Sequence, residues 1–208
     1  MILEYKNISF KNIIDDISFG LSNGEVIELD GVSGSGKTTI FKLATKLLYP
    51  DKGTIEYMGS DISKLDGNIV RSSIRYIPSK ISLPFDNILD NLYITKKYNP
   101  NKNFFDENTL KEFMKFFGID NNMRVESLSM GEIQRLSLLM GIYDKPAVLL
   151  LDEPISNNDI DNSLKISKFI EIISSIHNIS IIFTTHQKDI IESDRKLTIE
   201  NKRVIDAY

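Results

Sequence analysis

The chain begins with apolar residues in short runs, a pattern typical of β-strands. Runs at 2–10 and 17–19 are separated by Asn and Asp turn residues, so we expect two antiparallel strands there. A third strand is predicted at 25–29, where the apolar run ends before Asp-Gly. Between 37 and 48 the apolar positions recur at three and four residues, which predicts a helix with one buried face.

The middle of the chain changes from strand patterns to helical ones. A hairpin is expected around 54–58, and a short strand at 74–77. From about 84 to 145 the apolar spacing is helical, with Gly118 as an expected helix C-cap. The segment 99–103, with its three asparagines and one proline, is the most loop-like stretch.

Two runs in the last third consist only of apolar residues. They cover 148–151 and 181–183, and such runs suit parallel strands that are buried on both faces. The sequence between them predicts a crossover helix over about 163–177.

The order of elements predicts an α/β fold. We expect a mainly parallel sheet core with an N-terminal antiparallel β part and a helical subdomain. The chain is expected to form one domain, 1–208, in which 1–83 and 146–208 build a core lobe and 84–145 a helical lobe.

The composition narrows the class of protein. Of 208 residues, 41% are hydrophobic and 26% charged, as in soluble globular proteins. No apolar run reaches the roughly 18 to 20 residues of a membrane span, and no secretory signal precedes residue 7, so we expect a cytoplasmic chain without direct membrane insertion. The lack of cysteine excludes disulfides and thiol nucleophiles, and the net charge of −4 argues against nucleic acid as a main partner.

The strand at 25–29 and the helix from 37 enclose a glycine-rich loop that fits G-x-x-x-x-G-K-[ST]. Its glycines allow successive N–H groups to turn toward phosphate oxygens, and the helix N-terminus adds a positive dipole end. Lys37 supplies a cation for the β- and γ-phosphates, and the Thr38 hydroxyl suits Mg²⁺. A flexible linker is the competing interpretation, but linkers rarely join a strand to an amphipathic helix. The expected nucleotide-binding residues of this loop are Gly31, Val32, Ser33, Gly34, Ser35, Gly36, Lys37, Thr38 and Thr39.

Two acidic residues follow the buried run at 148–151. Asp152 and Glu153 stand at the carboxyl end of a predicted parallel strand, the sheet edge where ligands bind in open α/β folds. Asp152 suits Mg²⁺, because this hard cation prefers oxygen ligands. Glu153 is placed to polarise a water for attack on the γ-phosphorus.

Three more stretches follow the glycine-rich loop in the chain and add to the evidence from the loop and the acidic pair. Residues 128–132 read Leu-Ser-Met-Gly-Glu, residues 156–159 read Ser-Asn-Asn-Asp, and His186 follows the strand at 181–183. In this order and at these separations the chain resembles the ATP-binding subunit of ABC transporters over nearly its whole length. The three stretches are then similar to the LSGGQ signature, to the D-loop with Asp159 in register, and to the switch histidine that contacts the γ-phosphate. His177 matches no motif and is expected at the surface.

The resemblance implies a P-loop NTPase fold of ABC type, with ATP and Mg²⁺ as ligands. Two such domains pack head to tail, as a homodimer or with a similar chain, so that the phosphate loop of one meets Ser129 and Gly131 of the other, with Asp159 close by. ATP binding closes the pair and hydrolysis opens it. Membrane-spanning transporter subunits, which are separate chains, dock in a groove between the lobes, which puts this chain on the cytoplasmic inner face of the cell membrane.

Several positions depart from the family pattern. Ser79 stands where the family's Q-loop has glutamine and reaches Mg²⁺ only through a bridging water, so we expect slower hydrolysis. Glu132 replaces the signature glutamine and is expected to point to solvent or to cap a helix, and Asn158 replaces a leucine and is expected to loosen the dimer seam. Phe10 is the expected adenine-stacking residue, with Tyr5 behind it, and a core position is the alternative for both.

Three functions compete. The favoured one is the ATP-hydrolysing subunit of a transporter. The alternatives are a nucleotide-gated module with weak hydrolysis, which Ser79 and Met130 suggest, and a soluble ABC-type ATPase that does not transport. In its residues 185–190 and its compact length, the chain resembles a small bacterial family that exports iron or other metals. Export of lipoproteins, peptides or antibiotics stays open as an alternative.

Overall fold

The N-terminal strands form a four-stranded antiparallel sheet in the computed structural model, which describes residues 1–98 and 102–207. Its order is β2-β1-β4-β5. The strands are β1 (Leu3–Phe10), β2 (Ile14–Leu21), β4 (Lys52–Tyr57) and β5 (Ser60–Asp61). The predicted strand pair and the predicted hairpin are both confirmed, and the pairing of β1 with β4 joins them into one sheet.

The second sheet has six strands in the order β10-β9-β3-β8-β7-β6. They are β3 (Val26–Gly31), β6 (Ile74–Ile77), β7 (Val148–Asp152), β8 (Ser180–Thr184), β9 (Arg195–Glu200) and β10 (Arg203–Ala207). All neighbours pair in parallel except β9 and β10. Every residue of β7 and β8 is buried, as the all-apolar runs predict.

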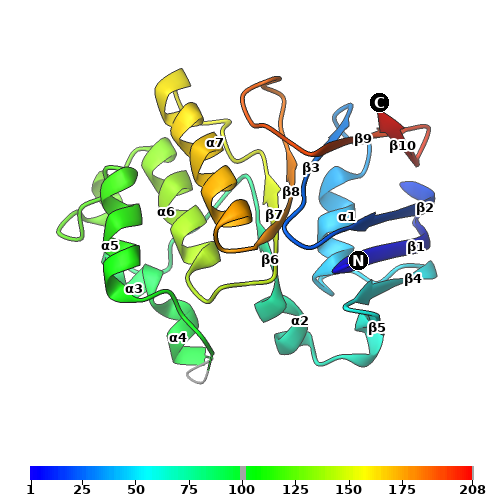
Figure 1. Cartoon of the computed structure of the whole chain (residues 1–208), viewed down its shortest axis with the longest axis horizontal. Helices are drawn as coiled ribbons and strands as arrows, with labels where there is room; N and C mark the ends of the chain where they lie inside the picture. Colours follow the sequence, from blue (N-terminus) through cyan, green and yellow to red (C-terminus); the bar gives the residue numbers. More distant parts are fainter. Residues whose placement is uncertain (99–101, 208) are drawn as a thin grey trace.

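The helices are α1 (Lys37–Ala44), α2 (Gly67–Ser73), α3 (Ile88–Leu92), α4 (Ile94–Tyr98), α5 (Glu107–Phe116), α6 (Met130–Ile142) and α7 (Ile160–Ser175), with 3₁₀ turns at Ile62–Lys64 and Val125–Ser127. Helix α1 lies between the two sheets, and α3, α5, α6 and α7 pack together on the other face of the parallel sheet. Figure 1 shows α3 to α6 at one end of the molecule and the antiparallel strands at the other. This is the α/β architecture that the sequence predicts, with an antiparallel N-terminal part.

Three local predictions need correction. The helix predicted over 37–48 ends at Ala44, because Lys46 takes a left-handed backbone with φ of 56° and turns the chain. The strands β9 and β10 were not predicted, because charged residues interrupt their short apolar stretches. The loop predicted at 99–103 is a separate case and not one of the three, because residues 99–101 lie outside the described residues.

His177 is the third correction. Its side chain is half-buried, and its ring packs edge-on against Phe105 with the ring centroids 4.7 Å apart. Burial lowers the pKa of His177, so the folded chain favours the neutral imidazole. The residue is therefore part of the aromatic packing beneath α5 rather than a free surface side chain.

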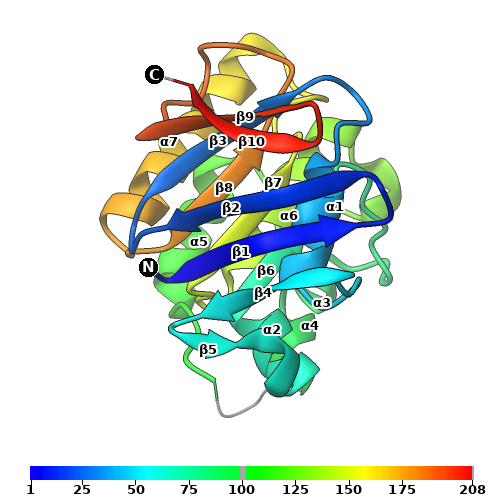
Figure 2. The same cartoon turned by 90° about the vertical axis from the view of Figure 1, so that its right-hand side faces the viewer.

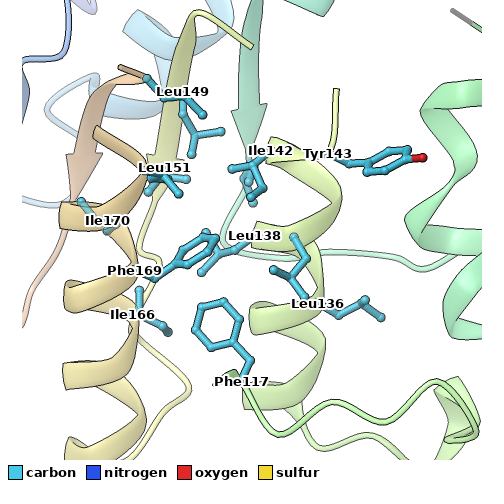
Figure 3. Close-up of a cluster of buried hydrophobic side chains, with 14 of the residues drawn as sticks. Phe117, Leu136, Leu138, Ile142, Tyr143, Leu149, Leu151, Ile166, Phe169 and Ile170 are labelled. Atoms are coloured by element: carbon cyan, nitrogen blue, oxygen red, sulfur yellow. The ribbon is translucent and has the colours of Figure 1, made fainter. Parts of the chain in front are cut away.

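One apolar core lies between the helices and β7 and β8. Phe169 of α7 packs edge-on against Phe117 with the ring centroids 4.8 Å apart, and Figure 3 shows these two rings next to each other, with Leu136 and Leu138 of α6 nearby. Leu149 and Leu151 of β7 close the cluster from the sheet side. This core fixes α6 and α7 against the strand that ends in Asp152.

A second core holds α1 between the two sheets. Ile40 and Phe41 of α1 pack in one cluster with Tyr5 of the antiparallel sheet and Leu29 of the parallel sheet. Figure 2 shows β1 and β2 in front of α1. Since α1 directly follows the glycine-rich loop, this packing fixes the loop in space.

A helix that spans a membrane must be both long and apolar. No helix in residues 1–98 and 102–207 combines the length and hydropathy that crossing a bilayer requires.

We predict that Phe169→Ala destabilises the fold by about 3–5 kcal/mol, because it opens a cavity between α6, α7 and β7. Leu164→Ala on the same helix is the control, since Leu164 is exposed and its loss should change stability by less than about 1 kcal/mol. Urea unfolding of both variants measures the difference. Equal losses in the two variants would contradict this description of the core.

Candidate active site

The glycine-rich loop connects the end of β3 to the start of α1, as the sequence predicts. Gly31, Gly34 and Gly36 have φ of 143°, 82° and 108°, which is a backbone region that side chains disfavour. A Cβ atom at Gly36 would also lie 2.6 Å from the Cγ2 of Ile14. Only glycine fits there, so the loop turns tightly against the antiparallel sheet.

Lys37 folds back over this loop. Its side chain is buried, and its Nζ donates to the carbonyl oxygens of Gly31 and, at 3.3 Å, of Val32. The nearby Ser35 hydroxyl is buried and has no hydrogen-bond partner in the described part of the chain. A cation and a spare hydroxyl therefore lie within a loop whose geometry suits phosphate.

The Asp152 carboxylate is the centre of a hydroxyl cluster. Thr38 Oγ1 and Tyr76 Oη donate to its Oδ2 at 2.8 and 3.0 Å, and Thr184 Oγ1 donates to its Oδ1 at 3.0 Å. Burial and the Asp152 charge raise the pKa of Tyr76, so the phenol stays protonated and keeps donating. A carboxylate beside a threonine hydroxyl is a donor set that suits Mg²⁺.

Tyr76 was not among the residues singled out from the sequence. It lies in the carboxyl-terminal half of β6, beside β7, and this position at the ligand-binding edge of the predicted sheet is the signal that could have identified it.

Glu153 has a strained backbone and a defined side-chain direction. Its φ is 55°, a left-handed value that costs energy in a residue with a side chain. Its N–H donates to the carbonyl and the hydroxyl oxygens of Thr184, both at 3.2 Å. The Oε2 atom accepts from the backbone N–H of His186 at 3.2 Å, and His186 Nε2 lies 3.4 Å from Oε1. The two predicted catalytic side chains are thus adjacent.

A cavity of about 390 Å³ brings these groups together. It is lined by Ile13, Ser33, Gly34, Ser35, Gly36, Lys37, Thr38, Thr39, Ser79, Asp152, Glu153 and His186. The phosphate loop, both acids, the Q-loop serine and the histidine therefore share one space, and their individual roles stay predictions.

Phe10 is not in this cavity. Its side chain is only 6% exposed and belongs to the core around α1, and Tyr5 is fully buried against Phe19. Neither ring is free to stack on adenine, so the core alternative holds for both. Ile13, from the turn between β1 and β2, is the apolar residue that the structure places on the cavity wall instead.

Ser129, Gly131 and Asp159 also lie outside this cavity. Ser129 caps α6, and Asp159 caps α7 by accepting from the N–H of Asn162 at 2.8 Å. A Cβ atom at Gly131 would lie 2.9 Å from the carbonyl oxygen of Asn157, so glycine permits close contact between the signature and the D-loop segment. The signature residues thus do not line the cavity that the chain's own phosphate loop forms.

A buried network that sequence reasoning missed connects the signature helix to Glu153. Gln134 Nε2 donates to the Glu153 carbonyl at 2.6 Å, and Asn158 Nδ2 donates to Gln134 Oε1 at 2.8 Å. Arg135 Nη1 in turn donates to Asn158 Oδ1 at 2.7 Å. Asn158, expected to loosen a dimer seam, therefore ties the D-loop segment to α6 within its own chain.

Comparison with known proteins agrees with this geometry. The family model for ABC transporters matches residues 14–156. The chain belongs to the ABC transporter family, and it is an ATP-binding subunit of that family with the fold of its ATPases.

Two relatives and one solved structure illustrate the similarity. The chain is 30% identical to the probable iron export ATP-binding protein FetA of Escherichia coli K12, over 96% of this chain and 91% of the relative. It is 27% identical to the phosphonates import ATP-binding protein PhnC of Treponema denticola, over 99% of this chain and 88% of the relative. A dimeric ATP-binding cassette in a post-hydrolysis state with ADP and Pi has the same fold, with a TM-score of 0.85 at 18% identity, over 99% and 97%.

We predict that Tyr76→Phe weakens metal binding by roughly 10-fold, because hydrogen bonds to a ligating carboxylate hold it in place. The Mg²⁺ concentration that gives half-maximal ATP hydrolysis should rise accordingly. Tyr49→Phe is the control, since Tyr49 is exposed. An unchanged Mg²⁺ dependence in Tyr76→Phe would show that Tyr76 does not position Asp152.

Proposed function

We propose that this chain hydrolyses ATP as one half of a head-to-tail dimer and that closing and opening of the dimer power membrane-spanning transporter subunits. The observation that carries the proposal is that the residues expected to bind ATP lie in two separate places on the chain. One cavity gathers the phosphate loop and Glu153, while Ser129 and Gly131 lie elsewhere at the start of α6. Each chain thus offers half of two nucleotide sites.

The exposed apolar side chains support a second copy as the partner. Val32 of the phosphate loop is 77% exposed, Met130 of the signature 56%, and Ile160 after the D-loop 60%. Apolar residues at the surface mark interaction sites when they gather at functional segments. Here such a residue lies in or directly after each of the three motifs that would meet in a head-to-tail dimer.

Within one chain, the residues divide the work of hydrolysis. The loop N–H groups bind the phosphates of ATP, and Lys37 exchanges the Gly31 carbonyl for phosphate oxygens. Thr38 and Asp152 would hold Mg²⁺, with Ser79 acting through a water, and the bound ion would supply positive charge to the phosphates. Glu153 accepts a proton from the water that attacks the γ-phosphorus, the bond to the bridging oxygen breaks, and His186 binds the γ-phosphate and holds the Glu153 carboxylate.

The second copy completes the site. Its Ser129 hydroxyl and Gly131 N–H bind the γ-phosphate from the other side, and its Asp159 lies at the junction of the two copies. ATP then stabilises the closed dimer, because it contacts both chains only in that state.

The proposed partners in the membrane follow from the relatives. FetA and PhnC are named as ATP-binding proteins of export and import, so we infer that this chain also works with separate membrane subunits, at the cytoplasmic face of the membrane. In this proposal residues 1–83 and 146–208 act as the core lobe and 84–145 as the helical lobe. The cargo is chosen by the membrane subunits, and the two relatives transport in opposite directions.

A cavity in the helical lobe supports docking of such a subunit. It measures about 680 Å³ and lies between α3 and α5. Leu89, Tyr93, Leu110 and Met114 line it, and charged residues including Lys111 and Asp120 surround them. This arrangement suits a short amphipathic helix of the membrane subunit. The cavity belongs wholly to the helical lobe and not to a groove between the lobes.

We predict that the ATPase rate per molecule rises with protein concentration and that Glu153→Gln lowers it about 100-fold or more, because the general base is lost. The variant should still dimerise with ATP, as measured by sedimentation. Glu171→Gln is the control for the same chemical change, since Glu171 is exposed on α7 and bonds to Lys168.

Two other outcomes distinguish the alternatives. A constant rate per molecule without any dimer would refute the head-to-tail ATPase. Tight ATP binding and dimerisation with negligible turnover in the unaltered chain would favour the nucleotide-gated module instead.

A further inference from the structure

The Ser129 hydroxyl is already engaged within its own chain. Ser129 Oγ donates to Glu132 Oε2 at 2.7 Å, and the Ser129 N–H donates to the same oxygen at 2.8 Å. The Glu132 N–H donates back to Ser129 Oγ at 3.3 Å. These bonds form a capping box at the start of α6, which confirms the expectation that Glu132 caps the helix.

A serine hydroxyl has one hydrogen to donate. In the proposed dimer that hydrogen is needed by the γ-phosphate bound to the other copy. It cannot serve the Glu132 carboxylate and a phosphate oxygen at the same time. Closing the dimer therefore requires this hydrogen bond to be exchanged.

The carboxylate also keeps its charge at this place. The hydrogen bonds from Ser129 lower the pKa of Glu132, so the group stays ionised near neutral pH. The anion occupies the positive end of the α6 dipole, where a phosphate would otherwise be favoured. An incoming γ-phosphate thus meets both a competitor and a like charge.

Arg135 acts on Glu132 through its charge, but no hydrogen bond or ion pair joins these two side chains in the described residues. Arg135 lies one turn along α6, and its Nε donates to the Phe117 carbonyl at 3.3 Å while its Nη1 donates to Asn158. Its guanidinium is thus held in the buried network toward Glu153. Glu132 therefore keeps its hydrogen bonds to Ser129, while Arg135 offsets part of the Glu132 charge from one turn away.

We propose that Glu132 acts as a built-in brake on dimer closure, by holding the signature serine in a self-capped state that ATP on the second copy must displace. The inference rests on the proposed head-to-tail dimer. The chain has glutamate where the family signature has glutamine. With this brake, the dimer needs higher concentrations of ATP and of protein to close.

The test compares variants in the Glu153→Gln background, which retains ATP. Glu132→Gln keeps the helix cap, because a glutamine oxygen at this position also accepts from the serine N–H. It removes the charge, and the neutral amide oxygen holds the serine hydroxyl more weakly than a carboxylate does. We expect ATP-driven dimerisation, measured by sedimentation over a range of ATP and protein concentrations, at a roughly 10-fold lower concentration than with Glu153→Gln alone. Circular dichroism checks that α6 is retained.

Two controls separate the local contact from charge in general. Glu126→Gln removes the same charge from an exposed residue just before the signature and should give little gain. Glu132→Asp keeps the charge and should give none. An equal gain in either control, or no gain in Glu132→Gln, would overturn the brake while Glu153→Gln still dimerises. If Glu153→Gln fails to dimerise at any ATP concentration, the dimer itself is refuted and the brake with it.

Discussion

The hydrogen bonding of one carboxylate, that of Asp152, connects the parts of the nucleotide site. Its oxygens accept hydrogens from Thr38, Tyr76 and Thr184, which belong to α1, β6 and β8. Because β6, β7 and β8 are parallel neighbours, their carboxyl ends meet at one edge of the sheet, and β3 beside β8 delivers the phosphate loop to the same edge. The two apolar cores on either side of the sheet hold this arrangement in place. Loop, acids and histidine therefore keep one mutual geometry.

A second set of polar contacts extends from this centre into α6. Gln134 bonds to the Glu153 carbonyl, and Asn158 and Arg135 continue the network to the D-loop segment. The same helix begins at Ser129, the residue proposed to bind ATP on another copy. Each chain thus joins the residues for its own site and those for its partner's site through one rigid helix. Because Gln134 and Arg135 are buried, breaking their bonds is costly, since an unpaired polar group is left behind.

The sequence predicted the strands around the phosphate loop and the acids because these segments carry strong local signals. Glycines that need left-handed angles, an all-apolar run ending in acid, and helical spacing are all readable without a partner. It did not predict β9 and β10, where charged residues interrupt short apolar stretches, nor the end of α1 at Ala44. Phe10 was the natural aromatic candidate for adenine, but its place inside the core follows from the pairing of β1 with both β2 and β4. His177 was expected at the surface, but the rings of Phe105 and Phe113, from a segment far away in the sequence, pack against it.

By itself the sequence determined the class of fold, the phosphate loop, the acidic pair and the family, because these depend on residue types at short, fixed separations. Only the tertiary structure decided which hydroxyls reach Asp152, that Ile13 rather than Phe10 lines the cavity, and that Glu132 occupies the Ser129 hydroxyl. Those facts depend on strand register, on helix position and on the direction of individual side chains. Such features arise from packing between segments that are far apart in the chain, and no local pattern of residues contains them.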